Sequence, residues 1–201
     1  MGEVRVTIGV DVLCSDGPYG HVRRLIVDPA ENTLTHLEVG DDKLPGWLVP
    51  ADEIAEGGAE VVLRSSTADL TRFEAALEER PTSWPYNPEE KSGRFPAGVE
   101  EVERDSAWGN VTTERDRIPA GGLEVRRGEP VYATDGMVGR TRGVCVELPS
   151  RRLTFLVLDA GHLWARTRLS IPIESVKRIA DGIQLDISKS EAQSLAGSAG
   201  A

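Results

Sequence analysis

The segment DVLCSDGPYGHVRRLIVDPAENTLTHLEV (11–39) returns later in the chain as PVYATDGMVGRTRGVCVELPSRRLTFLVL (130–158). The two segments align without a gap at a constant offset of 119 residues, the separation of Asp16 from Asp135. Further on the offset becomes 122, the separation of Pro50 from Pro172, so the length difference falls in one loop, where insertions are tolerated. An internal repeat decides the fold, because each copy must build the same unit. The chain therefore contains two copies of one module.

Matched positions in the two copies mark turns and strands. Asp-Gly is a strong turn pair, because glycine accepts a positive φ at no steric cost. The runs between the turns are rich in the residues that suit a pleated surface, and they predict strands over 22–27, 34–39, 141–146 and 153–158. Short strands with short connections and little helix favour a small closed or partly closed barrel over an α/β layer fold.

The chain between the copies has a different character. Leu70, Phe73 and Leu77 share one face at helical spacing, which predicts a helix that begins near Thr67 and ends at Pro81. Residues 81–122 are rich in proline, glycine and charge, as linkers are. Four rings in this stretch predict that parts of it lie against a barrel. They are Trp84, Tyr86, Phe95 and Trp108.

We therefore expect a mainly β protein built from two small barrels with short C-terminal helices and joined by a proline-rich linker. The expected divisions are a first barrel with a trailing helix, a polar and aromatic linker, a second barrel with a trailing helix, and a disordered tail of small residues. Their bounds are 1–80, 81–122, 123–195 and 196–201.

Composition limits the kinds of partner. The net charge of -10 disfavours nucleic acid, because phosphate binding needs a basic surface. Cys14 and Cys145 lack a CxxC spacing and are interpreted as small buried hydrophobes in a reducing compartment. No run approaches the ~18 apolar residues of a membrane span, and the first residues do not resemble a signal peptide. A cytoplasmic protein without membrane insertion is expected.

The repeated residues resemble the PRC-barrel family, the β-barrel module of the photosynthetic reaction-centre H subunit and of a ribosome-maturation factor. The shared pattern is Asp-Gly-x-x-Gly, a Val/Ile-rich strand, Leu-Thr-His-Leu-Glu-Val (34–39), and Val-Pro or Ile-Pro before an acidic turn. In the second copy 161–164 and 169–172 are similar to bacterial stand-alone members. The resemblance implies an adaptor that packs against other proteins and has no shared catalytic residues. Partner choice differs within this fold, so the fold does not identify the partner.

Side chains that could carry chemistry are few. Only His21, His36 and His162 are present, and the repeat equivalents of the first two are Arg140 and Phe155, so a metal or catalytic site built once per module is disfavoured. The Asp-Gly pairs lack the remaining ligands of a calcium loop and are explained by turn chemistry. Serines 65–66, 188 and 190, followed by acidic residues, predict helix caps rather than nucleophiles. We predict no catalytic residue, cofactor or metal.

Candidate partner-binding residues lie in the loops and basic spots. Trp47 and Trp164 occupy the corresponding variable loops, where an exposed tryptophan would anchor a partner and a buried one would close its own barrel. His162, Arg166 and Arg168 lie nearby in the sequence. Arginines also cluster at 23–24 and 151–152, where they either recognise carboxylates or form a solvated strand face.

The sequence thus predicts a non-enzymatic protein-interaction or assembly module whose protein partner is not identified. The alternative is a small-ligand-binding protein or an enzyme with a pocket at the interface between the barrels. Pairing of the barrels within one chain and formation of a homodimer both remain open.

Overall fold

The computed structural model describes residues 2–41, 43, 46–82, 111–161, 167–179 and 182–198. The chain is mainly β, as predicted. It divides into two compact units, of which unit 1 comprises Met1–Ala76 with Arg117–Ala201, and unit 2 is Leu77–Asp116. Both sequence repeats therefore belong to unit 1.

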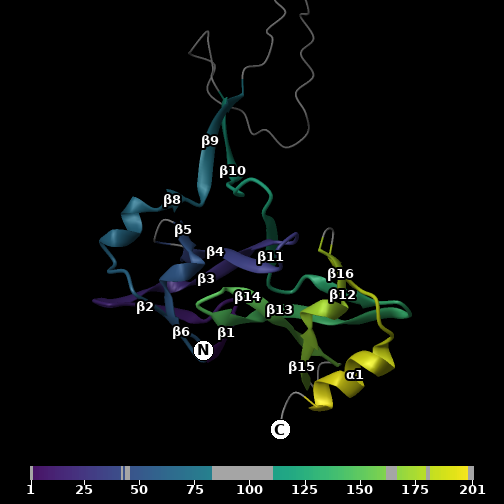
Figure 1. Ribbon diagram of the computed structural model, residues 1–201. Helices are drawn as coiled ribbons and strands as arrows, with labels where there is room; N and C mark the ends of the chain where they lie inside the picture. The colour runs from purple at the N-terminus through teal and green to yellow at the C-terminus, as the bar shows by residue number, and fades with distance from the viewer. Residues whose placement is uncertain are drawn as a thin grey trace, which may run out of the picture. The chain divides into compact units, whose positions relative to one another are not determined.

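The two repeats fold into the same order of elements as far as their last matched strand and differ after it (Figure 1). Repeat 1 contains β1 (Gly2–Thr7), β2 (Asp11–Cys14), β3 (Gly17–Asp28), β4 (Thr33–Gly40), β5 (Trp47–Pro50), the 3₁₀ helix η1 (Ala51–Glu53), β6 (Ile54–Glu56), β7 (Val61–Leu63), the 3₁₀ helix η2 (Asp69–Arg72) and β8 (Glu74–Ala75). Repeat 2 contains β11 (Leu123–Arg126), β12 (Pro130–Ala133), β13 (Gly136–Leu148), β14 (Arg152–Ala160), β15 (Thr167–Pro172), the 3₁₀ helix η3 (Ile173–Ser175), β16 (Val176–Ile179), β17 (Ile183–Leu185) and α1 (Lys189–Ser198). The predicted strands are confirmed. Pro50 and Pro172, the matched prolines of the two repeats, each end a strand.

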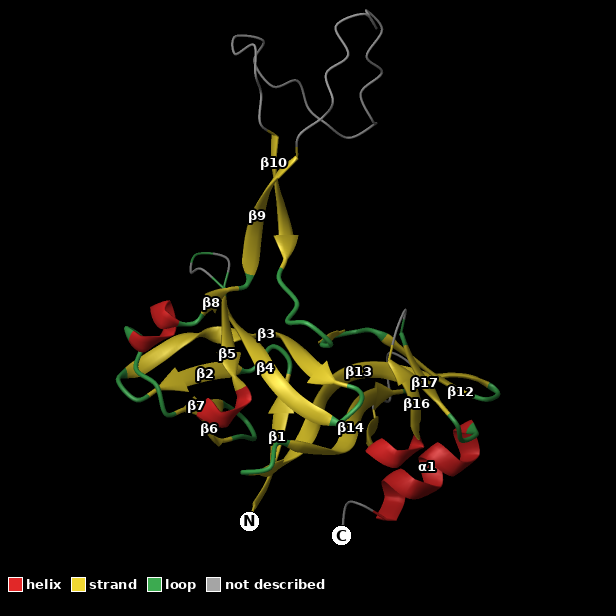
Figure 2. Cartoon of the chain, turned by 45° about the horizontal axis from the view of Figure 1, so that its top comes forward, coloured by secondary structure: helices red, strands yellow, loops and turns green. Residues whose placement is uncertain are grey.

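All described strands of unit 1 join one sheet. It has 15 strands, mostly antiparallel, with β2–β7 and β12–β17 paired in parallel (Figure 2). The expectation of two separate barrels is therefore not confirmed, because the repeats share hydrogen-bonded strands. The sequence pattern of each strand fixes its buried face but not the strand that it pairs with.

The repeats exchange their first strands. Strand β1 precedes repeat 1 in the chain yet pairs with β13 of repeat 2, with Val4 opposite Val146. Strand β11 precedes the rest of repeat 2 yet pairs with β3 of repeat 1, with Leu123 opposite Val27. The 119-residue offset maps the first of these pairs onto the second. The exchange is therefore reciprocal and relates the repeats as the halves of a symmetric dimer are related.

A pair of backbone hydrogen bonds marks the centre of this arrangement. The amide of Leu34 donates to the carbonyl of Arg151 at 2.9 Å, and the amide of Leu153 donates to the carbonyl of Asn32 at 2.8 Å. The same offset interchanges the two bonds. Asn32 and Arg151 both have a positive φ, 51° and 62°, so both turns take the left-handed conformation that brings β4 and β14 together.

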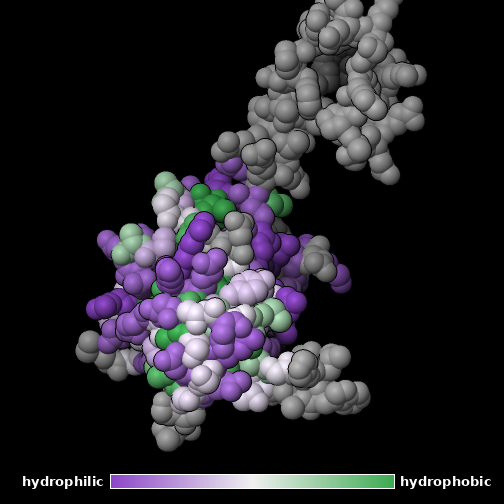
Figure 3. All heavy atoms as spheres, turned by 90° about the vertical axis from the view of Figure 1, so that its right-hand side faces the viewer, coloured by the Kyte–Doolittle hydropathy of each residue, from purple (hydrophilic) through white to green (hydrophobic). Residues whose placement is uncertain are grey.

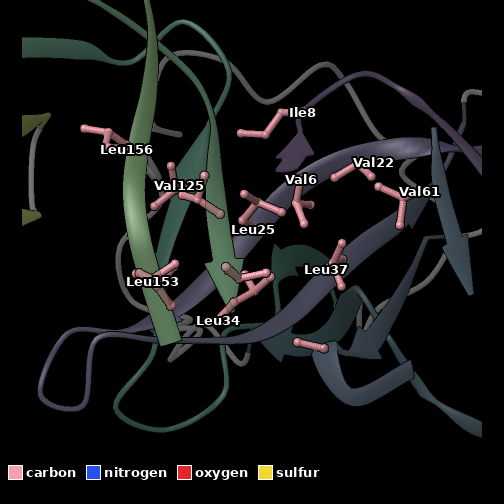
Figure 4. Packing of buried hydrophobic residues seen from close by; sticks show 14 of the residues in the cluster. Val6, Ile8, Val22, Leu25, Leu34, Leu37, Val61, Val125, Leu153 and Leu156 are labelled. Atoms are coloured by element: carbon pink, nitrogen blue, oxygen red, sulfur yellow. The ribbon is translucent and has the colours of Figure 1, made fainter. Parts of the chain in front are cut away.

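The main hydrophobic core of unit 1 contains residues of both repeats, and a second, small cluster consists of Ile26, Leu48 and Ala76. Close to the centre of the main core, Val6 and Val125 from the exchanged strands meet side chains of both repeats, including Leu25 and Leu153 (Figure 4). Val6 is completely buried and Val125 is 1% exposed. Burial of apolar surface contributes about 25 cal/mol per Å², so the repeats stabilise each other through shared apolar burial as well as through hydrogen bonds.

The segments that end the two modules differ in part from what the sequence predicts. The helix expected from Thr67 to Pro81 is wrong: only η2 forms, Phe73 is already extended, and β8 pairs with β5. Pairing with the open side of β5 satisfies backbone groups there, and Leu77 is 44% exposed instead of facing a core. The last residues of the expected linker 81–122, from Arg117 on, belong to unit 1. The helix expected after Ser188 is confirmed as α1, which extends to Ser198 into the expected tail.

Unit 2 contains a two-stranded antiparallel hairpin of β9 (Leu77–Thr82) and β10 (Val111–Asp116). The four aromatic residues of the expected linker lie outside the described residues. In the part of the chain that the structure describes, no helix has the length and apolarity needed to cross a membrane.

Candidate functional site

Among the predicted partner-binding residues, Trp47 is placed most clearly. Its ring is half-buried against the main core, and its indole N–H donates to the hydroxyl of Tyr19 at 2.7 Å. This arrangement agrees with the interpretation that the ring closes its own module. Arg168 is exposed on β15 opposite Asp159 of β14. The other candidates, His162, Trp164 and Arg166, lie outside the described residues.

The basic pair at 23–24 does not form a solvated strand face. Arg24 is 1% exposed, and its Nε donates to the buried carboxylate of Glu38. Its Nη1 donates to Glu124 at 2.8 Å, across a sequence separation of 100 residues. Arg23 keeps 40% of its side chain exposed and also pairs with Glu38, at 3.3 Å. Charged side chains are almost never fully buried unless paired, and Arg24 is paired twice.

Arg24 also holds the two ends of the chain that border unit 2. Its Nη2 lies 3.2 Å from the carbonyl oxygens of Ala76 and Arg117, and it donates to both. The amide of Arg117 in turn donates to the carbonyl of Ala76 at 2.7 Å. We call Arg24, Glu38 and Glu124, together with these two carbonyls, the Arg24 clamp. It closes unit 1 at the point where the chain leaves it and returns.

The arginines around Glu124 keep this carboxyl group charged although it is partly buried. Burial alone would raise the pKa of Glu124, but hydrogen bonds from Arg126 and Arg24 outweigh burial and lower it. The Arg126 bond is 3.0 Å long. Glu124 is therefore held as a carboxylate by two guanidinium groups, which are suited to such pairs because they stay charged and donate in a planar fork.

The buried Arg24–Glu38 pair of the clamp has no counterpart in repeat 2. At the equivalent positions repeat 2 has Gly143 in place of Arg24 and Val157 in place of Glu38. Both halves of the molecule thus share a backbone plan, but only one has a buried ion pair at this position. Comparison of the two repeats in the sequence indicates this ion pair, because Arg24 and Glu38 stand on paired strands at positions where repeat 2 has glycine and valine.

A pocket adjoins the clamp and shares Glu124 with it. Its volume is about 290 Å³. The lining residues are Ile118, Gly122, Leu123, Glu124, Glu129, Ile179 and Gly182. Ile118 is 42% exposed and is one of few large apolar side chains with this exposure among the described residues. Figure 3 shows a face of the protein that is largely hydrophilic, with small separate apolar areas.

A second pocket of about 350 Å³ lies where β1, β13, β14 and β15 meet. Its lining residues are Glu3, Glu147, Arg152, Leu153, Thr154, Phe155, Pro172 and Glu174. Glu3 and Glu147 stand directly opposite each other on paired strands, which is unfavourable for like charges. This pocket is more open to solvent than the pocket beside the clamp.

His36, Cys14 and Cys145 are all at least partly buried. His36 is half-buried on β4, and burial lowers its pKa, so it is neutral near pH 7. Both cysteines are buried, as predicted, and burial raises the pKa of the Cys14 and Cys145 thiols. Over the residues that the structure describes, no group of three or more His, Cys, Asp and Glu side chains could hold a metal ion.

Serine, aspartate and glutamate side chains form hydrogen bonds in the segment that follows the last matched strand of each repeat. Ser188 and Glu191 form reciprocal bonds at the start of α1, as predicted. Ser66 and Asp69 also bond reciprocally, but the N-cap of η2 is Ala68 without a side-chain cap bond, so neither predicted serine caps η2. An additional connection was not predicted: Asp16 accepts hydrogen bonds from the amide and hydroxyl of Thr67, at 2.7 and 2.8 Å. Asp135 does the same for the amide of residue 189, at 2.9 Å. The two Asp-Gly turns therefore also fix helix starts.

Comparison with known proteins finds no family model that matches the chain. No curated protein matches it either. The resemblance to the PRC-barrel family stays a hypothesis based on the residues quoted above.

Proposed function

We propose that this chain is a non-enzymatic interaction or assembly module built from two PRC-like β modules. In this proposal unit 1 is a rigid body. We call the adjacent chain segments at Ala76 and Arg117, which the Arg24 clamp holds together, the neck, and we propose that the neck positions the groups that contact a partner. The single observation that carries the proposal is the clamp itself, which fixes Ala76 and Arg117 side by side through one buried guanidinium.

The cost of such a clamp supports an organising role. Taking charges out of water costs several kcal/mol per ion, and apolar replacements of buried ion pairs are often neutral or stabilising. Repeat 2 uses Gly143 and Val157 at these positions, so the same backbone plan is built without the ion pair. We infer that repeat 1 retains charge here because it specifies one geometry for the neck.

A rigid neck would favour binding by reducing the entropy that association costs. Each rotamer-rich side chain immobilised at an interface costs about 0.5–1.5 kcal/mol, and preorganised segments avoid part of this cost. The reciprocal strand exchange supports the same view, because it leaves the repeats no simple hinge between them.

Photo-crosslinking in the native cell tests the proposal. A photoreactive phenylalanine analogue at Ile118, beside the clamp, is compared with the same analogue at Met137, which is 49% exposed in repeat 2. We expect a discrete adduct of one additional protein at position 118 and none of that mass at 137. Equal adduct patterns at the two positions, or turnover of a metabolite by the purified chain, would contradict the proposal.

The alternative, a small-ligand-binding protein, is favoured by a different observation. The pocket beside the clamp combines apolar walls with carboxylates, as binding sites for small molecules do.

A further inference from the structure

The pocket beside the clamp lies at a contact where the two repeats differ. In repeat 1, Gly57 lies directly on β1: a Cβ at this glycine would be 2.7 Å from the carbonyl oxygen of Arg5 and 3.3 Å from the Cβ of Val4. The repeat offsets map Gly57 onto Ile179, and Val4 and Arg5 onto two residues of β11. In repeat 2 those same elements enclose a cavity of about 290 Å³.

The walls of this pocket are suited to a short apolar group. Ile118, Leu123 and Ile179 supply aliphatic surface, and Gly122 and Gly182 complete this part of the lining. Pockets for drug-sized ligands span about 300–1,000 Å³, so this one accommodates a small molecule or one side chain rather than a large cofactor.

The polar part of the pocket includes two carboxyl groups, of which one is paired with arginines and the other is in no ion pair within the part of the chain that the structure describes. Glu124 is paired with Arg24 and Arg126. Glu129 is half-buried, and among the described residues it forms no ion pair. Burial, with a smaller contribution from the charge of Glu124, raises the pKa of Glu129, although a backbone hydrogen bond from Arg126 and the charge of Arg126 act in the opposite direction. Its charged form therefore lacks stabilisation that a ligand could supply.

We propose that this pocket binds a small organic cation, a primary ammonium or a guanidinium group on a short apolar stem. The stem lies against Ile118, Leu123 and Ile179, and the cation pairs with Glu129. An anionic ligand would meet two carboxylates, and a neutral ligand would form no ion pair with Glu129. The same chemistry reaches the pocket as a free amine or as a lysine or arginine side chain of another protein.

An NMR titration of the full chain, labelled with ¹⁵N, tests this assignment. The probes are n-butylammonium, n-butylguanidinium, 1-butanol and butyrate. Saturable shifts are expected at the amides of Gly122, Leu123 and Gly182 with the two cations, at affinities at least about tenfold higher than with butanol, because bonds to charged groups contribute more. Absence of saturation at these amides, or equal affinity for butanol, would overturn the proposal.

Two matched variants separate the pocket from general electrostatic attraction. Glu129→Gln keeps the shape of the side chain and should remove the preference for the cations, with the melting temperature unchanged. Glu147→Gln removes one carboxylate from the other pocket and should keep the preference. A preference that survives Glu129→Gln would contradict the assignment even if binding is observed. A blocked lysine derivative that binds at least as tightly as butylammonium identifies a protein side chain as the source, and weaker binding identifies a free amine.

Discussion

Replacement of Arg24 by methionine tests the clamp most directly. Methionine fills a similar volume but leaves the buried Glu38 with only Arg23, whose side chain is 40% exposed, and leaves the Arg117 carbonyl without the donor that Arg24 supplies. Removing one partner of a buried ion pair costs about 3–5 kcal/mol. For a body of this size each kcal/mol lowers the melting temperature by about 2–4 °C, so we expect a decrease of roughly 6–20 °C.

Urea denaturation followed by circular dichroism measures this change, and two further variants interpret it. Arg23→Met, at the exposed neighbour, should cost no more than about 1 kcal/mol. Arg24→Met combined with Glu38→Val removes both charges and brings position 38 to the valine of repeat 2, so it should recover a large part of the loss, with a coupling of about 1–3 kcal/mol. The clamp reasoning is refuted if Arg24→Met costs less than about 1 kcal/mol, or if the double variant is less stable than the sum of the single changes.

Three further predictions concern the fold. Gly143→Ala places a Cβ 2.2 Å from the carbonyl oxygen of Val6 and should lower the free energy of unfolding in urea by about 1–3 kcal/mol. Gly2→Ala has open space at its Cβ and should leave the free energy of unfolding almost unchanged. Equal effects of the two changes would argue against close contact of β1 and β13. A chain cleaved at a protease site engineered within 83–110 should elute as one particle in native buffer and separate only in denaturant, because the exchanged strands hold both fragments; separation in native buffer would exclude the exchange. Hydrogen bonds from Thr67 lower the pKa of Asp16, so its contribution to stability is present above the ordinary aspartate pKa and is lost as the pH falls through the lowered value. Asp16→Asn should therefore flatten the decline of the urea midpoint between about pH 5 and 3, and an unchanged slope would remove Asp16 from the explanation.

Local features of the fold could be predicted from the sequence, and the partners of its strands could not. The Asp-Gly turns, the strands between them and the Ser188–Glu191 cap depend on residues close in sequence, and the structure confirms them. Strand β1 would bury Val6 whether it paired within its own repeat or with β13, so its pattern does not distinguish the two. The predicted helix after Thr67 failed because pairing with β5 outweighed helical periodicity.

The candidate site was missed for a related reason. An arginine on a strand is expected at the surface, and Arg24 is buried only because its partners arrive from β4 and, 100 residues away, from β11. Comparison of the repeats would have indicated the position, since repeat 2 has glycine there. The partner at Glu124 is visible only once β11 is known to pair with β3.

The clamp and the pocket meet on β11, and the strand exchange is the reason. By sequence β11 belongs to repeat 2, where its residues line a pocket together with Ile179. By pairing it belongs to repeat 1, where it lies beside Arg24 on β3. Glu124 therefore takes part in both features, and a ligand at Glu129 would bind next to the charges that hold Ala76 and Arg117 together. In two independent barrels these residues would lie in separate modules, so the exchange is what allows differences between the repeats to combine into one site.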